Sequence, residues 1–168
     1  SDGVHMLYPG KVHSFYGEPE SGKSFVAQGV AAQVIKDGGT VLYLDYETDA
    51  ATVVERLLLM GVAGDDVRDR FVYVAPESRP GDGLDQLLGR SYDLAVVDGV
   101  TEALVISDSK TNDNDDVTKW IRRVCRRIAD ATGAAVVMVD HVTKSKDGRG
   151  RSAIGAQAKL AALSGPAY

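Results

Sequence analysis

The stretch GEPESGKS, Gly17–Ser24, decides the fold of this 168-residue chain. It follows an apolar run, Lys11–Gly17, that is typical of a β-strand, and it leads into a helical pattern that extends to Gly39. A turn between the two elements would need only the glycines, so the lysine and the serine require another explanation. The spacing G-x-x-x-x-G-K-S between a strand and a helix is typical of a loop that binds phosphate groups, whereas a bare glycine-rich turn with an exposed lysine explains neither the motif nor its context.

The backbone of this loop gives it a specific chemistry. Glycine permits the tight conformation in which successive amides point inward and bind an anion, and the following helix adds its positive N-terminal end. We expect Lys23 to reach the β- and γ-phosphates of ATP and Ser24 to place its hydroxyl on Mg²⁺. The predicted nucleotide-binding residues are Gly17, Glu18, Pro19, Glu20, Ser21, Gly22, Lys23, Ser24 and Phe25.

Length and composition set wider limits. The length suits one hydrophobic core, so a single domain spanning residues 1–168 is expected. The net charge of −5 argues against a uniformly basic nucleic-acid coat protein, although it is compatible with a local basic patch. The single cysteine, Cys125, excludes an intrachain disulfide and a zinc-type cysteine cluster. No apolar run approaches the roughly 20 residues that cross a bilayer, and no secretory signal is visible, so a cytoplasmic protein without membrane contact is predicted.

Apolar, β-branched runs alternate with helical patterns along the chain. The expected strands are 11–17, 40–47, 70–76, 92–99 and 134–141, and the expected helices are 24–39, 50–60, 83–90 and one that begins at 117. The strand runs are continuously apolar, which is typical of a sheet buried on both faces. The predicted fold is an α/β three-layer sandwich with a mainly parallel central sheet. Because a doubly wound sheet usually has further strands, we also expect the chain to be a C-terminally truncated piece of a longer protein.

Acidic residues stand where two of the predicted strands end. Asp98 closes the apolar run LAVVD, and we expect it to hold Mg²⁺ directly or through water; alternatively, it only caps a turn before Gly99. Many ATPases carry a catalytic glutamate directly after this aspartate, but here Glu102 lies further along. Glu47, two residues beyond Asp45, is therefore the predicted group that orients or deprotonates the attacking water; alternatively, it is a solvated carboxylate that leads a helix.

Taken together, these motifs resemble a known group. A phosphate loop, a glutamate after the second strand, VVD at Val96–Asp98 and VMVDH at Val137–His141 give the layout of RecA-like P-loop ATPases. The nearest resemblance is to plasmid RepA-type hexameric replicative helicases and related phage and plasmid AAA-domain ATPases, and it extends over about residues 11–163, including DHVTKSKDGRGRSAIGAQAK. The resemblance implies an Mg²⁺-dependent ATPase that acts as a DNA helicase or translocase in a replication module, as a ring of identical subunits such as a hexamer.

The resemblance also implies roles for residues at and after the last predicted strand. His141 is implied to sense the γ-phosphate, and with Glu47 and Lys23 it completes the predicted catalytic set; alternatively, it is a histidine satisfied at a strand end. The implied contacts with single-stranded DNA, or with the ATP of a neighbouring subunit, come from the loop residues Lys144, Lys146, Arg149 and Arg151. Alternatively, this segment is only a solvated loop.

Two other functions stay open on the sequence alone. The first is a regulatory or assembly module that binds ATP and oligomerises with little turnover. The second is a small-molecule kinase, for which TKSKDGRGR would be an arginine-rich lid. Glu47 and the Asp140–His141 pair favour the ATPase over the kinase. Measuring ATP hydrolysis with and without single-stranded DNA distinguishes the regulatory module from the helicase.

Overall fold

The computed structural model describes residues 6–77, 82–109, 113–141 and 162–168. Within these ranges one five-stranded sheet is formed by β1 (Val12–Gly17), β2 (Val41–Asp45), β3 (Phe71–Val74), β4 (Leu94–Asp98) and β5 (Ala135–His141). The strand order is β1-β5-β4-β2-β3, and every neighbouring pair is parallel. The predicted α/β fold is confirmed, and the described sheet is parallel throughout.

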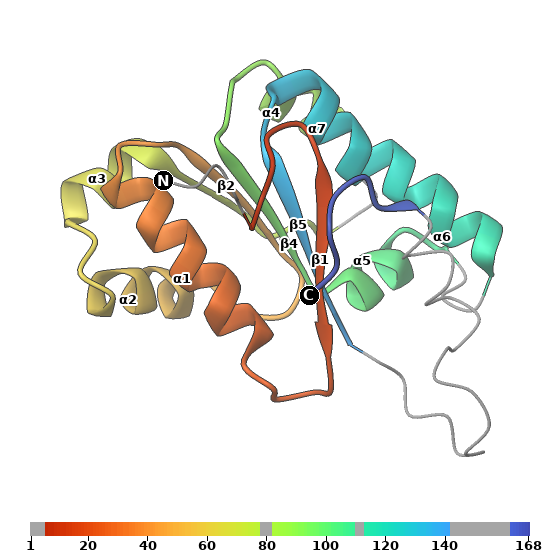
Figure 1. The fold of residues 1–168 in the computed structure, drawn as a ribbon, viewed down its shortest axis with the longest axis horizontal. Coiled ribbons are helices and arrows are strands. Elements are labelled where there is room, and N and C mark those ends of the chain that lie inside the picture. Colours follow the sequence, from red (N-terminus) through yellow and green to blue (C-terminus); the bar gives the residue numbers. More distant parts are fainter. Residues whose placement is uncertain (1–5, 78–81, 110–112, 142–161) are drawn as a thin grey trace.

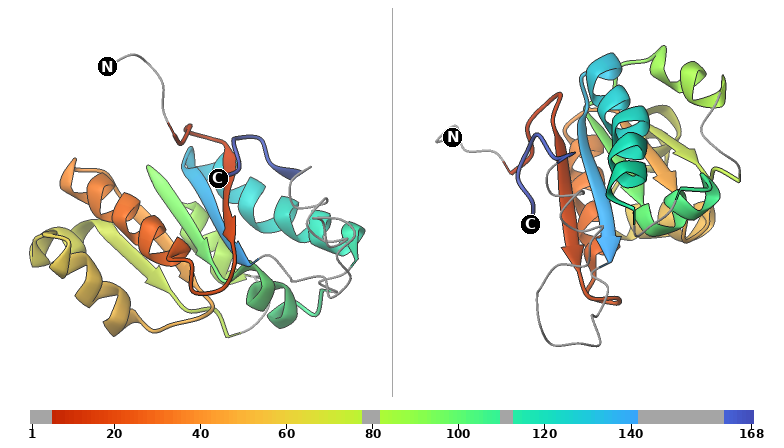
Figure 2. Two further views of the ribbon diagram at one scale, coloured as in Figure 1. Left: turned by 60° about the horizontal axis from the view of Figure 1, so that its bottom comes forward. Right: turned by 90° about the vertical axis from the view of Figure 1, so that its right-hand side faces the viewer.

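Helices cover both faces of the sheet, which makes the three layers seen in Figures 1 and 2. One face carries α1 (Lys23–Lys36), α2 (Ala50–Leu59) and α3 (Gly64–Arg70). The other carries α4 (Asp82–Leu88), α5 (Val100–Ile106), α6 (Asn114–Ile121), the π-helical turn η1 (Arg122–Arg126) and α7 (Arg127–Thr132). Alternate strand residues feed the two cores: Tyr43 packs on the α1 side, whereas Leu42 and Leu44 pack on the α7 side. This division explains why the strand sequences are apolar without interruption.

The register of the strands places polar residues at one edge of the sheet. Gly17, the last residue of β1, lies opposite His141, the last residue of β5. Asp45 at the end of β2 lies opposite Asp98 at the end of β4. Because all of these strands run the same way, the phosphate loop and the residues that follow β2, β4 and β5 meet at this carboxyl edge.

Two helices were not predicted, for different reasons. Helix α3 buries only one of its residues, Val67, so no apolar period marks it; ion pairs such as Asp66–Arg70, four residues apart, support it instead. Helix α5 begins directly after β4, and its apolar residues continue those of the strand. The helix expected from 117 begins earlier, because the Asp113 side chain accepts hydrogen bonds from two backbone amides and caps α6.

The C-terminal segment, residues 162–168, is largely irregular and carries one bridge to the sheet. Its last residues lie along β1 (Figure 1), where the backbone amide of Tyr16 donates to the carbonyl of Tyr168 at 2.9 Å. The amide of Tyr168 in turn donates to the carbonyl of Ser14 at 2.8 Å, and Ser14 and Ala167 form a parallel bridge. Across the described ranges, no helix combines the length and the apolar character that a membrane crossing would need.

Candidate functional site

The loop between β1 and α1 curves around the side chain of its own lysine. Gly22, the residue before α1, has a φ of 82°, a left-handed conformation that glycine adopts without a steric penalty. Lys23 is buried, and its Nζ donates to the carbonyl oxygens of Gly17 and Glu18 at 3.1 and 2.6 Å and to Oγ of Ser21 at 3.2 Å. The ammonium group therefore lies against the loop that would hold phosphate, within reach of an anion bound there.

The first turn of α1 is joined to the end of β4 by a serine and an aspartate. The hydroxyl of Ser24 donates to Oδ1 of Asp98 at 2.9 Å, and the phenol of Tyr43 donates to Oδ2 at 2.5 Å. Burial raises the pKa of Asp98, and these two hydrogen bonds oppose that shift, while the nearby charge of Asp45 reinforces it. Both carboxylate oxygens of a buried aspartate are thus held by hydroxyl donors.

Tyr43 connects this aspartate to the helices above the sheet. Its hydroxyl accepts a hydrogen bond from Nε2 of Gln28 at 3.3 Å, and Oε1 of the same amide accepts from Arg56 at 3.3 Å. Burial, and then the charge of Asp98, raise the pKa of Tyr43 far above its ordinary value, so the phenol keeps its proton and acts as a donor. The result is a chain of hydrogen bonds from α2 through α1 and β2 to Asp98.

Asp45 builds the turn that carries Glu47. One carboxylate oxygen of Asp45 accepts from the backbone amides of Glu47 and Thr48, both at 2.9 Å. The other oxygen accepts from the Thr48 hydroxyl at 2.5 Å and from the Tyr73 phenol at 3.0 Å. With its acceptor positions used in this way, Asp45 fixes the backbone from which the Glu47 side chain projects.

Glu47 lies between a histidine and a second glutamate. Its Oε1 is 2.9 Å from Nε2 of His141. Burial raises the pKa of Glu47; the hydrogen bond to His141 opposes the shift, and the charges of Glu102 and Asp98 add to it. Gly99, with a φ of 88°, separates the two glutamates so narrowly that a Cβ there would lie 2.7 Å from Cγ of Glu47 and 3.1 Å from Oε2 of Glu102.

Two buried polar atoms beside Glu47 have no hydrogen-bond partner among the described residues, namely Oε2 of Glu102 and Nδ1 of His141. Buried polar groups are normally satisfied, so these atoms suit a polar ligand or a water at this edge. The described ranges contain no group of three His, Cys, Asp or Glu residues that could hold a metal. A hydroxyl and one carboxylate, as at Ser24 and Asp98, instead fit Mg²⁺, which takes few protein ligands beside phosphate oxygens.

The carboxyl edge of the sheet therefore gathers most of the predicted site. Lys23, Ser24, Glu47, Asp98 and His141 all lie there. In the loop, residues 18–21 are exposed, and Phe25 at the start of α1 is 58% exposed. The basic residues Lys144, Lys146, Arg149 and Arg151 lie outside the described residues.

Sequence reasoning missed two residues of this edge and gave no role to a third, Glu102. The sequence pattern around Tyr43 and Gln28 is typical of core residues of a strand and a helix. Their neighbours in the sequence do not indicate that each forms a hydrogen bond with a residue of another element. Glu102 carried a usable signal, since it follows Asp98 by four residues and so lies one turn into the helix after β4.

Comparisons with known proteins agree with this geometry. A sequence model of the family described as AAA domain matches residues 3–147. The fold is similar to the crystal structure of the flagellar accessory protein FlaH from Methanocaldococcus jannaschii, with a TM-score of 0.58 and 14% sequence identity over 80% of this chain. The present chain spans 62% of that protein, and a likeness at this identity concerns the fold alone. No curated protein matches the sequence.

Proposed function

We propose, from the premise that this chain belongs to the AAA domain family of P-loop ATPases, that it hydrolyses ATP with Mg²⁺ and converts the energy into movement along single-stranded DNA, as a helicase or translocase. The observation that carries the proposal is the meeting of Lys23, the Ser24–Asp98 pair and Glu47 at one edge of the sheet. A phosphate loop alone would only bind a nucleotide, whereas a metal-side carboxylate and a candidate base together suit hydrolysis.

Lys23 and the loop amides would bind the β- and γ-phosphates. The lysine now donates to loop carbonyls, and an incoming phosphate would replace these neutral acceptors with a stronger, charged one. Ser24 and Asp98 would hold Mg²⁺, which neutralises phosphate charge when it is bound. The hydrogen bond from Tyr43 would keep the carboxylate of Asp98 oriented toward Ser24 during this exchange.

Glu47 would orient and deprotonate the attacking water. The turn built by Asp45 fixes its backbone, and His141 fixes its carboxylate. The raised pKa of Glu47 makes it a stronger base than an ordinary glutamate, which suits proton abstraction. His141 is the last residue of β5, so a change in its hydrogen bond to Glu47 would shift the point at which the chain leaves the sheet.

The decisive experiment measures ATP turnover with Mg²⁺ for the natural chain and for Glu47→Gln. The substitution keeps the shape and removes the base, so turnover should fall by at least about a hundredfold while ATP binding persists. Glu55→Gln, an exposed change on α2, is the matched control and should hydrolyse at the natural rate. Unaltered turnover in Glu47→Gln would remove Glu47 from the mechanism.

A second function is favoured by one comparison. The structural relative FlaH is named as a flagellar accessory protein, and an accessory role would suit a nucleotide-dependent assembly module better than a helicase. On this alternative the chain binds ATP, forms homo-oligomers and recruits a partner with little turnover. Turnover that rises several-fold with single-stranded DNA supports the translocase, whereas slow turnover that DNA leaves unchanged, with a particle size that grows on ATP binding, supports the assembly role.

A further inference from the structure

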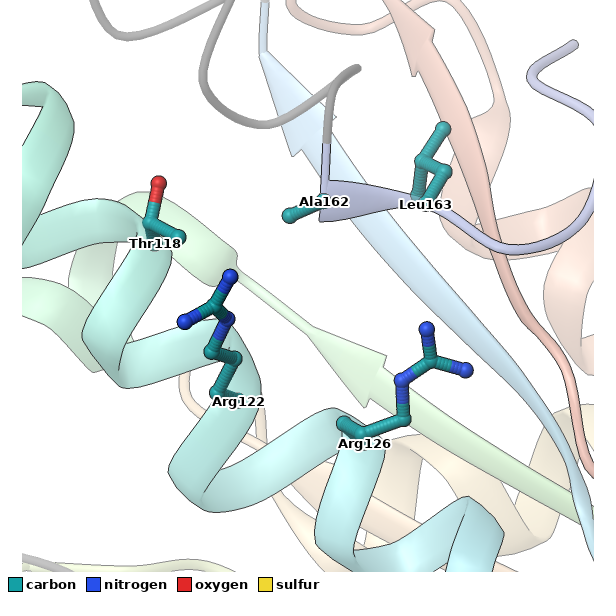
Figure 3. A pocket seen from close by; sticks show the side chains of 5 residues that line it. All are labelled: Thr118, Arg122, Arg126, Ala162 and Leu163. Carbon is teal, nitrogen blue, oxygen red and sulfur yellow. The ribbon is translucent and has the colours of Figure 1, made fainter.

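A stripe of one helix, on the sheet face opposite α1, carries cationic side chains that the proposed ATPase site does not use. Thr118, Arg122 and Arg126 recur at intervals of four residues along α6 and η1. Together with Ala162 and Leu163 they line a cavity of about 240 Å³ (Figure 3). Figure 3 shows both guanidinium groups rising from the helix toward the segment that contains Ala162 and Leu163.

The two cavity arginines have no counter-ion among the described residues. Arg127, the next residue along the chain, by contrast forms an ion pair with Asp85 of α4 at 2.7 Å. Arg126 is half-buried, and a guanidinium that is partly removed from water without an anion is left with hydrogen-bonding capacity unused. This arrangement favours an anionic ligand in the cavity.

The backbone beneath these arginines is unusual. Arg122–Arg126 is a π-helical turn between two α-helical segments. π-Turns are rare and occur frequently at functional sites. Arg122 and Arg126 are the first and last residues of this turn and both line the cavity, whereas Arg123 lies on the same turn outside it.

We propose that Arg122 and Arg126, with the Thr118 hydroxyl, bind consecutive phosphates of single-stranded nucleic acid. A guanidinium binds a phosphate through two parallel hydrogen bonds, and Thr118 adds a neutral donor. The two guanidinium groups enter one cavity from positions four residues apart on the same helix, as two consecutive phosphates of one strand would require. The apolar side chains of Ala162 and Leu163 suit a sugar on the opposite wall. The choice of nucleic acid as the carrier of the phosphates rests on the proposed function.

The test compares two double variants that remove the same charge from the same helix. Arg122→Gln with Arg126→Gln empties the cavity of cations, and Arg123→Gln with Arg127→Gln is the matched control. Binding of a fluorescent single-stranded oligonucleotide is followed by anisotropy over a range of salt concentrations, without nucleotide. We expect the cavity variant to lose at least about tenfold in affinity and about 1.4 in the salt slope, since each lost phosphate contact contributes about 0.7. The control should change less than about twofold.

Several outcomes would overturn the inference. Equal losses of DNA affinity in the two double variants would mean that only the total positive charge of the helix matters. An unchanged affinity in the cavity variant would show that Arg122 and Arg126 do not bind DNA. Arginine-dependent binding of pyrophosphate to a Lys23→Ala chain, with no such dependence for DNA, would assign the cavity to a free phosphate ligand. If the glutamine variant is poorly folded by circular dichroism, Arg122→Lys with Arg126→Lys keeps the charge, and its loss of the paired hydrogen bonds should still weaken binding several-fold.

The same proteins separate this inference from the proposed function. DNA-free ATP turnover should be equal in the natural chain and in both double variants, because none of these arginines forms a hydrogen bond or ion pair with Lys23, Ser24, Glu47, Asp98 or His141 among the described residues. An active ATPase that binds no DNA would leave the hydrolysis proposal standing and would overturn the cavity assignment. A chain that binds DNA through the cavity but does not hydrolyse ATP would support the cavity assignment and overturn the hydrolysis proposal.

Discussion

Tyr43→Phe isolates a single hydrogen bond beneath the proposed metal site. The change deletes one hydroxyl and keeps the ring, which packs against Phe71 and Tyr73 at centroid distances of 5.8 and 6.3 Å. The hydroxyl donates to Asp98 at 2.5 Å inside the core, where Tyr43 itself is fully buried. The variant therefore tests whether this bond holds the carboxylate without disturbing the packing around it.

The expected loss follows from the charge and burial of Asp98. A hydrogen bond to a charged group contributes about 1.5–3 kcal/mol, so the free energy of unfolding should fall by about that amount at neutral pH. For a domain of this size the melting temperature should drop by roughly 3–12 °C. The amide of Gln28, which now donates to the same hydroxyl, loses its acceptor as well.

The pH dependence of this stability loss tests whether Asp98 is the hydrogen-bond partner responsible for it. Burial raises the native pKa of Asp98, so the protonated carboxyl favours the folded state, and this contribution is lost as the pH rises through the native pKa. The Tyr43 hydrogen bond lowers that pKa, so ionising Asp98 costs more free energy in the variant than in the natural chain. The loss of unfolding free energy is therefore greatest at neutral pH, where Asp98 is ionised. Below the native pKa both proteins hold a neutral Asp98, and the deficit should shrink to about 0.5–1.5 kcal/mol.

Urea unfolding followed by the fluorescence of Trp120 measures this difference at neutral and acidic pH. Tyr16→Phe, at an exposed tyrosine of β1, is the control and should match the natural chain at both. A Tyr43→Phe chain that is as stable as the natural one, or whose deficit is independent of pH, would refute the coupling to Asp98.

Three further changes test other parts of the edge. Gly99→Ala should cost about 1–2 kcal/mol of stability, because alanine at a φ of 88° is strained and its Cβ meets Glu47; thermal unfolding indistinguishable from the natural chain would contradict this. The pH profile of kcat should show an acid limb above the ordinary glutamate range, and His141→Ala should move it to higher pH, since the histidine lowers the pKa of Glu47; a limb that does not move would rule out this bond during turnover. Ser24→Ala should raise the Mg²⁺ concentration for half-maximal turnover about tenfold, or ~1.4 kcal/mol, and an unchanged Mg²⁺ dependence would remove Ser24 from the metal site.

The layers of the fold and the outline of the site could be predicted because their signals are local. The phosphate loop is contiguous, and Asp98 and His141 each end an apolar run, so strand polarity alone brings them to one edge. The assignment of Lys23, Glu47 and His141 to catalysis stays a prediction that activity measurements must decide.

What the sequence did not predict depends on contacts between distant elements. The Tyr43–Asp98 bond joins residues of β2 and β4, and neither residue's neighbours in the sequence indicate the other. Helix α3 buries a single valine and is supported by charge pairs at its surface. The π-turn at Arg122–Arg126 follows no apolar or polar period, because its register depends on how the helix packs over the sheet.

The position of β1 in the sheet has a consequence for folding. Its partners among the described residues are β5, where Val12 pairs with Val136, and the segment that ends at Tyr168. Both lie more than a hundred residues away, so β1 docks only after long loops have closed, and such non-local pairing is slow. A nascent chain therefore exposes the phosphate-loop motif long before the strand that supports it has its neighbours. Nucleotide binding to a folding chain should consequently report the last pairing event in the sheet, and not the first.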